Sequence, residues 1–338
     1  MSGCAYNENK DEKIMKRVQE HYDYLIEQGY EVVFIALQGS QNYGLDVYDD
    51  DYMSDVDTKA VVLPSFKDFV NNKAPVSKTI VLDNEEHIDV KDVRVMFEMF
   101  RKMNVSYIEL LYTKYKIINP KYANPILKLF KNRTEVSSIN RNQFLRCIAG
   151  MSMEKVKALK HPYPGLIEKI EKYGFDGKQL SHCVRLQEFI TRYVNGEKIE
   201  DCYMSKMPAV LINLKKNLNQ DGKGYMSVDE AERMCKGIDT ITKKIKDENV
   251  TEIDIINQKG IDVLNNVKFN LMEQKFKEDL GISVEVLQKK KDECHEKLSY
   301  WEKQYRTAKK NNNSFYMHSY KREIDRWQSR LETLREFE

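Results

Sequence analysis

Apolar side chains follow two different patterns along the chain, and the change comes near residue 120. Residues 11–28 place apolar side chains on one helical face, which predicts an amphipathic helix. Residues 31–37 are nearly all apolar, as in a strand that is buried on both faces. A second apolar run at 55–63 predicts another strand, and the runs within 79–90 predict a hairpin. The first third of the chain is therefore expected to contain a sheet.

Helical spacing dominates after residue 120. Asn-Pro pairs at 119–120 and 124–125 mark the change. Five helices are predicted beyond them, at 136–159, 177–195, 205–218, 228–248 and 252–279. The chain is thus expected to be an α+β protein with domains at 1–120, 121–282 and 283–338.

The tail, residues 283–338, repeats apolar residues in steps of three and four on both sides of Asn311–Asn313. This spacing predicts two antiparallel helices in a coiled-coil hairpin. Packing on the preceding helices is the simplest role for the hairpin. Oligomerisation and contact with a macromolecular substrate are the alternatives.

The composition indicates a strongly hydrated protein without a membrane partner. Charged residues make up 32% of the 338 positions, and no apolar run approaches the roughly 18 residues of a membrane span. The six cysteines include no Cys-x-x-Cys pair, which favours reduced thiols over disulfides or a zinc site. The N-terminal stretch lacks the apolar core of a secretory signal, so we expect a cytoplasmic protein. A net charge of +2 does not by itself indicate nucleic-acid binding, and no pattern defines the oligomeric state.

The residues with the clearest chemistry lie where the first two apolar runs meet. Gly39-Ser40 follows the first run, and Asp55-Val56-Asp57 opens the second. Alternate residues of a strand point to one face, so Asp55 and Asp57 should project together. Adjacent carboxylates repel each other unless a cation lies between them, and Mg²⁺ combines carboxylate oxygens with substrate phosphates. A glycine-led turn also offers backbone N–H groups to phosphate. These residues predict a metal-dependent site for a nucleoside triphosphate.

A strand, Gly-Ser, a loop and Asp-x-Asp in this order resemble the nucleotidyltransferase superfamily related to DNA polymerase β. Tyr43-Gly44 in the loop and Ser54 before the first aspartate are more narrowly similar to the predicted nucleotidyltransferases of bacteria and phages. Two later segments are similar to the same family. They contain Asn104 with Glu109-Leu110-Leu111, and Lys178, His182 and Arg185 at helical spacing. The resemblance implies a small mixed-sheet nucleotidyltransferase domain followed by an all-α domain.

The superfamily carries a third carboxylate on a later strand, and Asp89 is the candidate for it. Asp92 is the alternative, but it precedes an apolar-periodic stretch and is better explained as a helix N-cap. Asp49–Asp51 form a run of acids in a loop, as in many solvated turns, and we assign them no ligand role. Glu109 is either a buried pairing partner or a site residue.

The resemblance also implies the ligands. Asp55, Asp57 and Asp89 are expected to hold two Mg²⁺ ions. The expected nucleotide-binding residues come from the turn, the second strand and one helix: Gly39, Ser40, Tyr43, Lys59, Lys178, His182 and Arg185. Lys59 lies where the family has an Arg, so the charge is kept without the planar fork of a guanidinium.

The predicted activity is transfer of a nucleoside monophosphate from a triphosphate, with ATP as the default, to an acceptor hydroxyl with release of pyrophosphate. RNA or another macromolecule is the expected acceptor. The alternatives are AMP transfer to a protein, and a nucleotide- or RNA-binding module without activity. The long helical half argues against the first alternative, and the presence of all three acids argues against the second.

Overall fold

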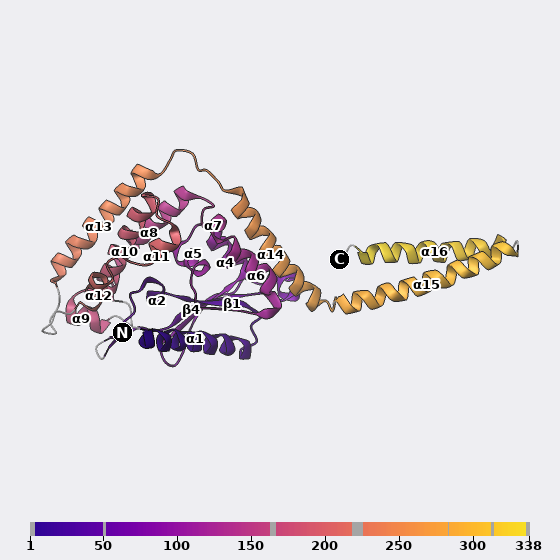
Figure 1. Ribbon diagram of the computed structural model, residues 1–338, viewed down its shortest axis with the longest axis horizontal. Coiled ribbons are helices and arrows are strands. Elements are labelled where there is room, and N and C mark those ends of the chain that lie inside the picture. Colours follow the sequence, from indigo (N-terminus) through magenta and orange to yellow (C-terminus); the bar gives the residue numbers. More distant parts are fainter. Residues whose placement is uncertain are drawn as a thin grey trace. The chain divides into compact units, whose positions relative to one another are not determined.

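The computed structural model describes residues 4–49, 52–162, 167–217, 226–282, 284–311 and 314–335 (Figure 1). The chain divides into two compact units. The first combines Met1–Pro64 with Asn72–Met272, and the second combines Ser65–Asn71 with Glu273–Glu338.

A five-stranded mixed sheet is the centre of the first unit. Its strands lie in the order β5 (Ser77–Val81), β6 (His87–Asp92), β4 (Asp57–Val62), β1 (Val32–Gln38) and β7 (Lys116–Ile118). β1 pairs antiparallel with β4 and β7, whereas β4 and β6 run parallel. The predicted hairpin is present as β5 and β6. A separate short pair, β2 (Tyr48–Asp49) and β3 (Tyr52–Met53), lies in the connection from β1 to β4.

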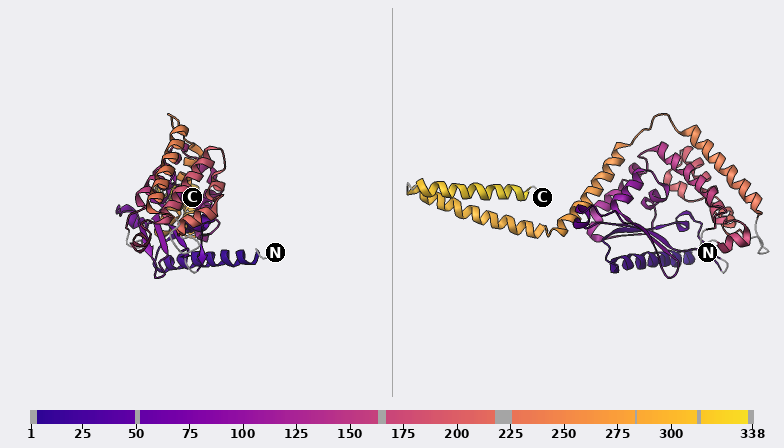
Figure 2. Two further views of the ribbon diagram at one scale, coloured as in Figure 1. Left: turned by 90° about the vertical axis from the view of Figure 1, so that its left-hand side faces the viewer. Right: turned by 180° about the vertical axis from the view of Figure 1, so that it is seen from behind.

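Helices cover both faces of this sheet, which explains why β1 is apolar throughout. On one face lies α1 (Cys4–Glu27) (Figures 1 and 2). Its side chains Ile14, Val18 and Leu25 belong to one buried cluster with Ile35 and Val90 of the strands. On the other face lie α4 (Val93–Arg101), α5 (Val105–Ile108) and α6 (Ala123–Lys131). The short segments α2 (Ser40–Tyr43), η1 (Glu109–Leu111) and η2 (Pro120–Tyr122) connect these elements.

Further helices follow along the chain and add to the hydrophobic core on the face of α4, α5 and α6. They are α7 (Arg133–Val136), α8 (Arg141–Ala158), α9 (Ile167–Tyr173), α10 (Gly177–Val194), α11 (Ile199–Tyr203), α12 (Pro208–Lys216), α13 (Val228–Asn249) and α14 (Gln258–Asp279). One buried cluster includes Phe34 of β1, Phe144 of α8, Phe189 of α10 and Val267 of α14. The helical layer and the sheet therefore share a hydrophobic core.

The second unit is built around α15 (Val284–Lys310) and α16 (Ser314–Arg335), which pack along each other as the predicted hairpin. Cys294 and Ala308 of α15 and Ile324 and Leu331 of α16 are buried. The helix α3 (Phe66–Val70) also belongs to this unit, because its two phenylalanines contact Phe276 of α14.

The α+β prediction is confirmed at the level of a mixed sheet with many helices. The helix predicted at 252–279 begins only at Gln258, because Ile256 forms an isolated β-bridge with Asn140. The three-domain division stays a prediction, since the compact units follow different boundaries. Asp50 and Asp51 of the acidic run, and Asn312 and Asn313 of the expected turn, lie outside the described residues. In the described ranges no helix is both long and apolar enough to cross a membrane.

Candidate active site

The turn after β1 adopts a backbone conformation that requires glycine. Gly39 has φ +100° and ψ −152°, a region that side-chain-bearing residues rarely enter. The turn continues as α2 and ends at Gly44, which is left-handed with φ +70°. Asn42 holds the turn against the strand, because its Nδ2 donates to the carbonyl of Leu37 at 2.9 Å. Ser40 is thereby presented at the end of β1, where it lines a cavity of about 250 Å³.

Glu109 contacts this turn through Tyr43. Its carboxylate is buried and accepts a hydrogen bond from the Tyr43 hydroxyl. Burial raises the pKa of Glu109, while the nearby charges of Lys59 and Arg185 oppose that rise. Gly39 also lines the cavity, and its contact with a phosphate stays a prediction.

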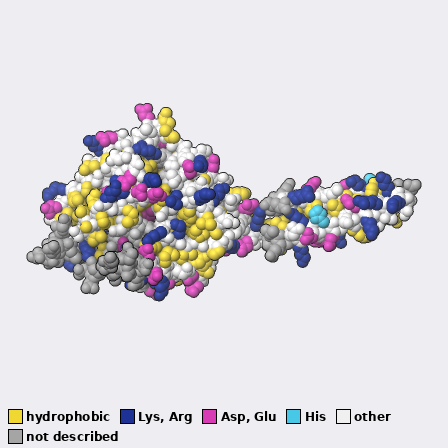
Figure 3. All heavy atoms as spheres, viewed as in Figure 1, with side chains coloured by type: hydrophobic (Ala, Val, Ile, Leu, Met, Phe, Trp, Pro, Cys, Tyr) yellow, Lys and Arg dark blue, Asp and Glu magenta, His cyan; other side chains and the backbone are white. Residues whose placement is uncertain are grey.

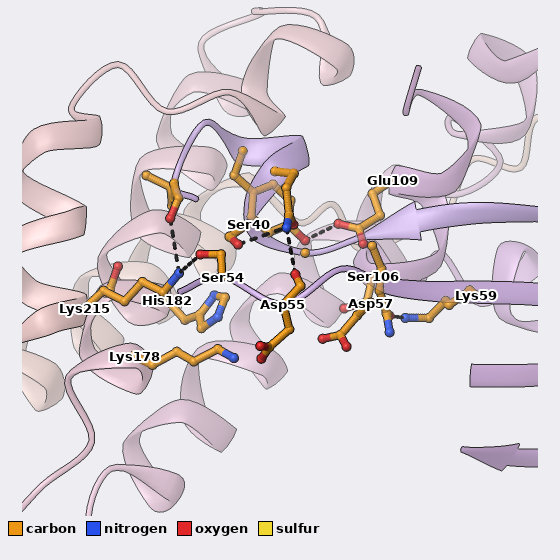
Figure 4. A pocket seen from close by; sticks show the side chains of 16 residues that line it. Ser40, Ser54, Asp55, Asp57, Lys59, Ser106, Glu109, Lys178, His182 and Lys215 are labelled. Carbon is orange, nitrogen blue, oxygen red and sulfur yellow. Dashed lines mark hydrogen bonds between the residues drawn. The ribbon is translucent and has the colours of Figure 1, made fainter. Parts of the chain in front are cut away.

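Two aspartates form an acidic wall of the cavity. Asp57 is the first residue of β4, and Asp55 precedes the strand, so the expected pair on one strand is only half correct. Both carboxylates nevertheless point the same way beside the turn (Figure 4). Gln41 holds the backbone here, because its Nε2 donates to the Asp55 carbonyl at 2.7 Å. The backbone N–H of His87 donates to Asp57 Oδ1 at 2.9 Å.

The electrostatics of this pair match a cation site. Desolvation raises the pKa of Asp55, and the neighbouring charge of Asp57 raises it further, while Lys178 lowers it. Two carboxylates that repel each other beside a polar cavity are a donor set that suits Mg²⁺, which binds one or two carboxylates together with substrate phosphates. Among the described residues no group of three or more His, Cys, Asp or Glu is assembled for a metal. A Mg²⁺ ion at this site would therefore be held by the carboxylates of Asp55 and Asp57 together with oxygen atoms of a substrate.

Asp89 does not join this pair. In the parallel register of β4 and β6 it lies opposite Lys59, beyond Asp57 along the strand. Its Oδ1 is 2.8 Å from Lys91 Nζ, and the Tyr107 hydroxyl also contacts its carboxylate. Asp89 is not among the residues that line the cavity. The structure thus brings Asp55 and Asp57 together and places the expected third ligand outside.

A second wall of the cavity is cationic and comes from two helices. Lys178 and His182 project from α10, and Lys215 projects from α12 (Figure 4). The two helices touch at Gly177, where an added Cβ would lie 2.3 Å from the carbonyl oxygen of Leu214. This close approach brings Lys215 beside α10, with its Nζ 3.2 Å from the Leu45 carbonyl and 3.3 Å from Ser54 Oγ.

His182 is held neutral by its surroundings. Desolvation lowers its pKa well below the ordinary value, and four cations add to the effect: Arg185, Lys155, Lys178 and Lys215. A neutral imidazole can donate one hydrogen bond and accept another. The wall therefore combines two ammonium groups with a neutral hydrogen-bonding ring.

Two other expected nucleotide-binding residues have structural contacts. The Arg185 guanidinium is buried and lies 3.8 Å from the ring centroid of Tyr43, and it does not line the cavity. Tyr43 lines the cavity but is buried between Arg185 and Glu109. Arg185 thus contacts the turn through Tyr43, and its role in nucleotide binding stays a prediction.

Lys59 reaches the cavity from β4. Its Nζ donates to Gln38 Oε1 and lies 5.0 Å from the ring centroid of Tyr107. Burial lowers its pKa, while the charges of Glu109 and Asp89 counteract that fall. Lys59 is thus a buried cation that links the end of β1 to β4.

The sequence prediction missed several cavity residues. Lys215, Ser54, Gln41 and Ser106 line the cavity beside the predicted ones. The sequence distinguishes Ser54 only by its place in the segment that resembles the nucleotidyltransferases. Lys215 lies in an ordinary helix, and no spacing in the sequence distinguishes it from its neighbour Lys216.

Comparison of the chain with protein-family models and with curated proteins found no match. The functional interpretation therefore depends on the geometry of this cavity and on the motifs that form it.

Proposed function

We propose that the chain is a Mg²⁺-dependent nucleotidyltransferase, which moves a nucleoside monophosphate from a triphosphate to an acceptor hydroxyl. The observation that supports this most directly is the division of one cavity into two walls. Asp55 and Asp57 face it from the start of β4, and Lys178, His182 and Lys215 face it from α10 and α12. Cationic side chains can bind the phosphate oxygens of a triphosphate, and a Mg²⁺ ion on those phosphates needs carboxylate ligands as well.

The residues have distinct roles in this proposal. Asp55 and Asp57 would hold Mg²⁺, which supplies charge neutralisation at the phosphates and lowers the pKa of a bound hydroxyl. Lys178 and Lys215 would contact phosphate oxygens, and Ser40 would donate its hydroxyl to them. Neutral His182 would donate to a phosphate or accept from the acceptor hydroxyl. Glu109, Tyr43 and Arg185 would keep the turn in place.

The reaction exchanges one phosphorus–oxygen bond for another. The acceptor oxygen forms a bond to the α-phosphorus, the bond to the bridging oxygen breaks, and pyrophosphate leaves. The acceptor proton goes to a base at the site or to water. Because the chemistry is an in-line displacement, positioning and electrostatic stabilisation supply most of the rate. This proposal uses neither Asp89 as a third ligand nor a second Mg²⁺, both of which are expectations from the resemblance alone.

Transfer can be tested with α-labelled nucleotides, ATP first, incubated with the protein, Mg²⁺ and either total RNA or cell lysate. We expect label in RNA. Label in a protein would favour AMP transfer to a protein, and label in neither would favour a binding module. Asp57→Asn should abolish transfer and leave the fold intact, since the amide oxygen can still accept from His87 N–H. Asp89→Asn removes a carboxylate one strand away and serves as the matched comparison. Transfer by the Asp57→Asn variant at the wild-type rate would exclude the metal role.

A further inference from the structure

Four small or apolar side chains of α15 and α16 are buried in the hairpin. Cys294, Ala308, Ile324 and Leu331 are each at most 7% exposed. Over the described residues of both helices, the exposed large hydrophobic side chains are Val286, Tyr300 and Tyr316. A second coiled-coil partner would need a continuous apolar stripe on the outside. The outer surface of the hairpin is therefore poorly suited to a second copy of the chain.

Positive charge is concentrated in the half of the hairpin next to its turn, which we call the distal half (residues 297–326). It contains eight Lys and Arg residues and three acids, whereas the rest of the chain contains 47 basic and 50 acidic residues. The side chains of Arg306, Lys321 and Arg326 are 78%, 55% and 70% exposed. Their contacts with acids on the same helices are surface ion pairs, which contribute little and leave the cations accessible. Lys and Arg side chains are visible along the hairpin in Figure 3.

Aromatic rings occupy the same half. Tyr300 lies 5.0 Å from Trp301, Trp301 lies 5.6 Å from Tyr320, and Tyr320 stacks on Tyr316 at 5.9 Å between ring centroids. The outer members of this row, Tyr300 and Tyr316, are 53% and 49% exposed. The row therefore presents ring surface on two helices within a region of excess positive charge.

We propose that the distal half binds a single-stranded polynucleotide. Exposed lysines and arginines match a row of phosphates, and exposed tyrosines offer platforms on which unpaired bases stack. A protein partner recognised by charge alone would gain nothing from the rings. The proposal rests on the proposed function only in naming the acceptor class, since binding by the hairpin requires no transfer chemistry.

The test measures fluorescence anisotropy of a 5′-labelled single-stranded oligouridine of 20 nucleotides, titrated with the full-length protein between 50 and 200 mM KCl. Lys309→Ala/Lys310→Ala removes two exposed charges from the distal half, and Lys289→Ala/Lys290→Ala removes two from the other half of the same helix. We expect the first variant to weaken binding about tenfold and to flatten the salt slope by about 1.4, at roughly 0.7 per phosphate contact. The second should change affinity less than twofold. Equal weakening by the two variants would overturn the assignment to the distal half.

Stacking is tested separately with Tyr300→Ala/Tyr316→Ala against Tyr300→Phe/Tyr316→Phe. We expect about a tenfold loss for the alanine variant and near wild-type affinity for the phenylalanine variant, because the ring face is what stacks. The same 20 bases in a duplex should bind more weakly and should not respond to the tyrosine changes. Equal affinity for the duplex, or unchanged binding by the alanine variant, would contradict the stacking role. Circular dichroism and thermal unfolding verify that each variant is folded.

Failure of this proposal is distinguishable from failure of the proposed function. Asp57→Asn should bind oligouridine like the wild type although it transfers no nucleotide. Binding without any transfer by the wild type would leave the hairpin proposal standing and refute the enzyme. Transfer to another acceptor, with no measurable oligouridine binding, would support the enzyme and refute the hairpin proposal.

Discussion

The two walls of the cavity arise from the chain in different ways. The acidic wall comes from a short segment, in which Asp55 and Asp57 follow Gly39 within 18 residues and lie at the start of a buried strand. The cationic wall comes from α10 and α12, which are far along the chain and meet through the close contact at Gly177. The first wall is set by strand geometry, whereas the second depends on tertiary packing. One wall of the site is therefore formed by residues close together in the sequence, and the other by residues that only tertiary packing brings to it.

The largest expected effect is loss of the acidic wall. Asp55→Asn should reduce the rate of nucleotide transfer at least about 10³-fold, because a metal ion contributes several kcal/mol to stabilising the developing charge. Asp89→Asn should cost less than about tenfold, since its carboxylate contacts Lys91 and Tyr107 outside the cavity. Single-turnover rates at saturating Mg²⁺ compare the two. An equally large loss in Asp89→Asn would place the third carboxylate back in the site.

The cationic wall should affect nucleotide binding more than the chemical step. Lys178→Ala and Lys215→Ala should each raise the KM for the nucleotide about 10- to 100-fold, as expected for a charge-assisted hydrogen bond to phosphate. Lys216→Ala is the matched control, because that side chain does not line the cavity. Steady-state kinetics measure the three variants. A similar KM for Lys215→Ala and Lys216→Ala would remove Lys215 from the site.

A smaller effect, on stability, is expected at Gly39, where the turn after β1 begins. Gly39→Ala should lower the free energy of unfolding by about 1–3 kcal/mol, because φ is +100° at that position. Gly150→Ala in α8 is the control: an added Cβ meets no atom within 4 Å, so it should stabilise the protein by up to about 1 kcal/mol. Urea unfolding compares the two variants. An unchanged or higher free energy of unfolding for Gly39→Ala would show that the turn is not strained.

The smallest effect is the pH dependence from His182. Its pKa is lowered in the folded state, so the unfolded chain binds the extra proton first, and stability falls as the pH drops below about 6.5. The slope is at most about 1.4 kcal/mol per pH unit for one such group. His182→Gln should therefore lose less stability between pH 7 and pH 5 than the wild type. His21, whose pKa is also lowered by burial, should retain its own contribution in that variant. Thermal unfolding midpoints at the two pH values measure the difference, and identical losses in wild type and variant would refute the assignment.

Residue patterns predicted most of the sheet and the acidic wall, for physical reasons. A strand buried on both faces needs continuous apolar residues, and an N-cap needs a short polar side chain, so β1 and the cap at Asp92 follow from the sequence. The contact between Arg185 and Tyr43 could not be predicted from the sequence. Helical spacing shows on which face of a helix a side chain lies, but not which residues pack against that face. Lys215 was missed for the same reason.

Nucleotide binding with and without Mg²⁺ tests the central claim most directly, namely that one cavity seats a metal-bound triphosphate between the two walls. Isothermal titration with ATP is measured in Mg²⁺ and in EDTA, for the wild type, for Asp55→Asn/Asp57→Asn and for Lys178→Ala/Lys215→Ala. We expect wild-type binding to be at least tenfold tighter in Mg²⁺, the aspartate variant to lose that difference, and the lysine variant to bind more weakly in both conditions. Equal wild-type affinity in Mg²⁺ and EDTA, or ATP binding that neither variant changes, would contradict it.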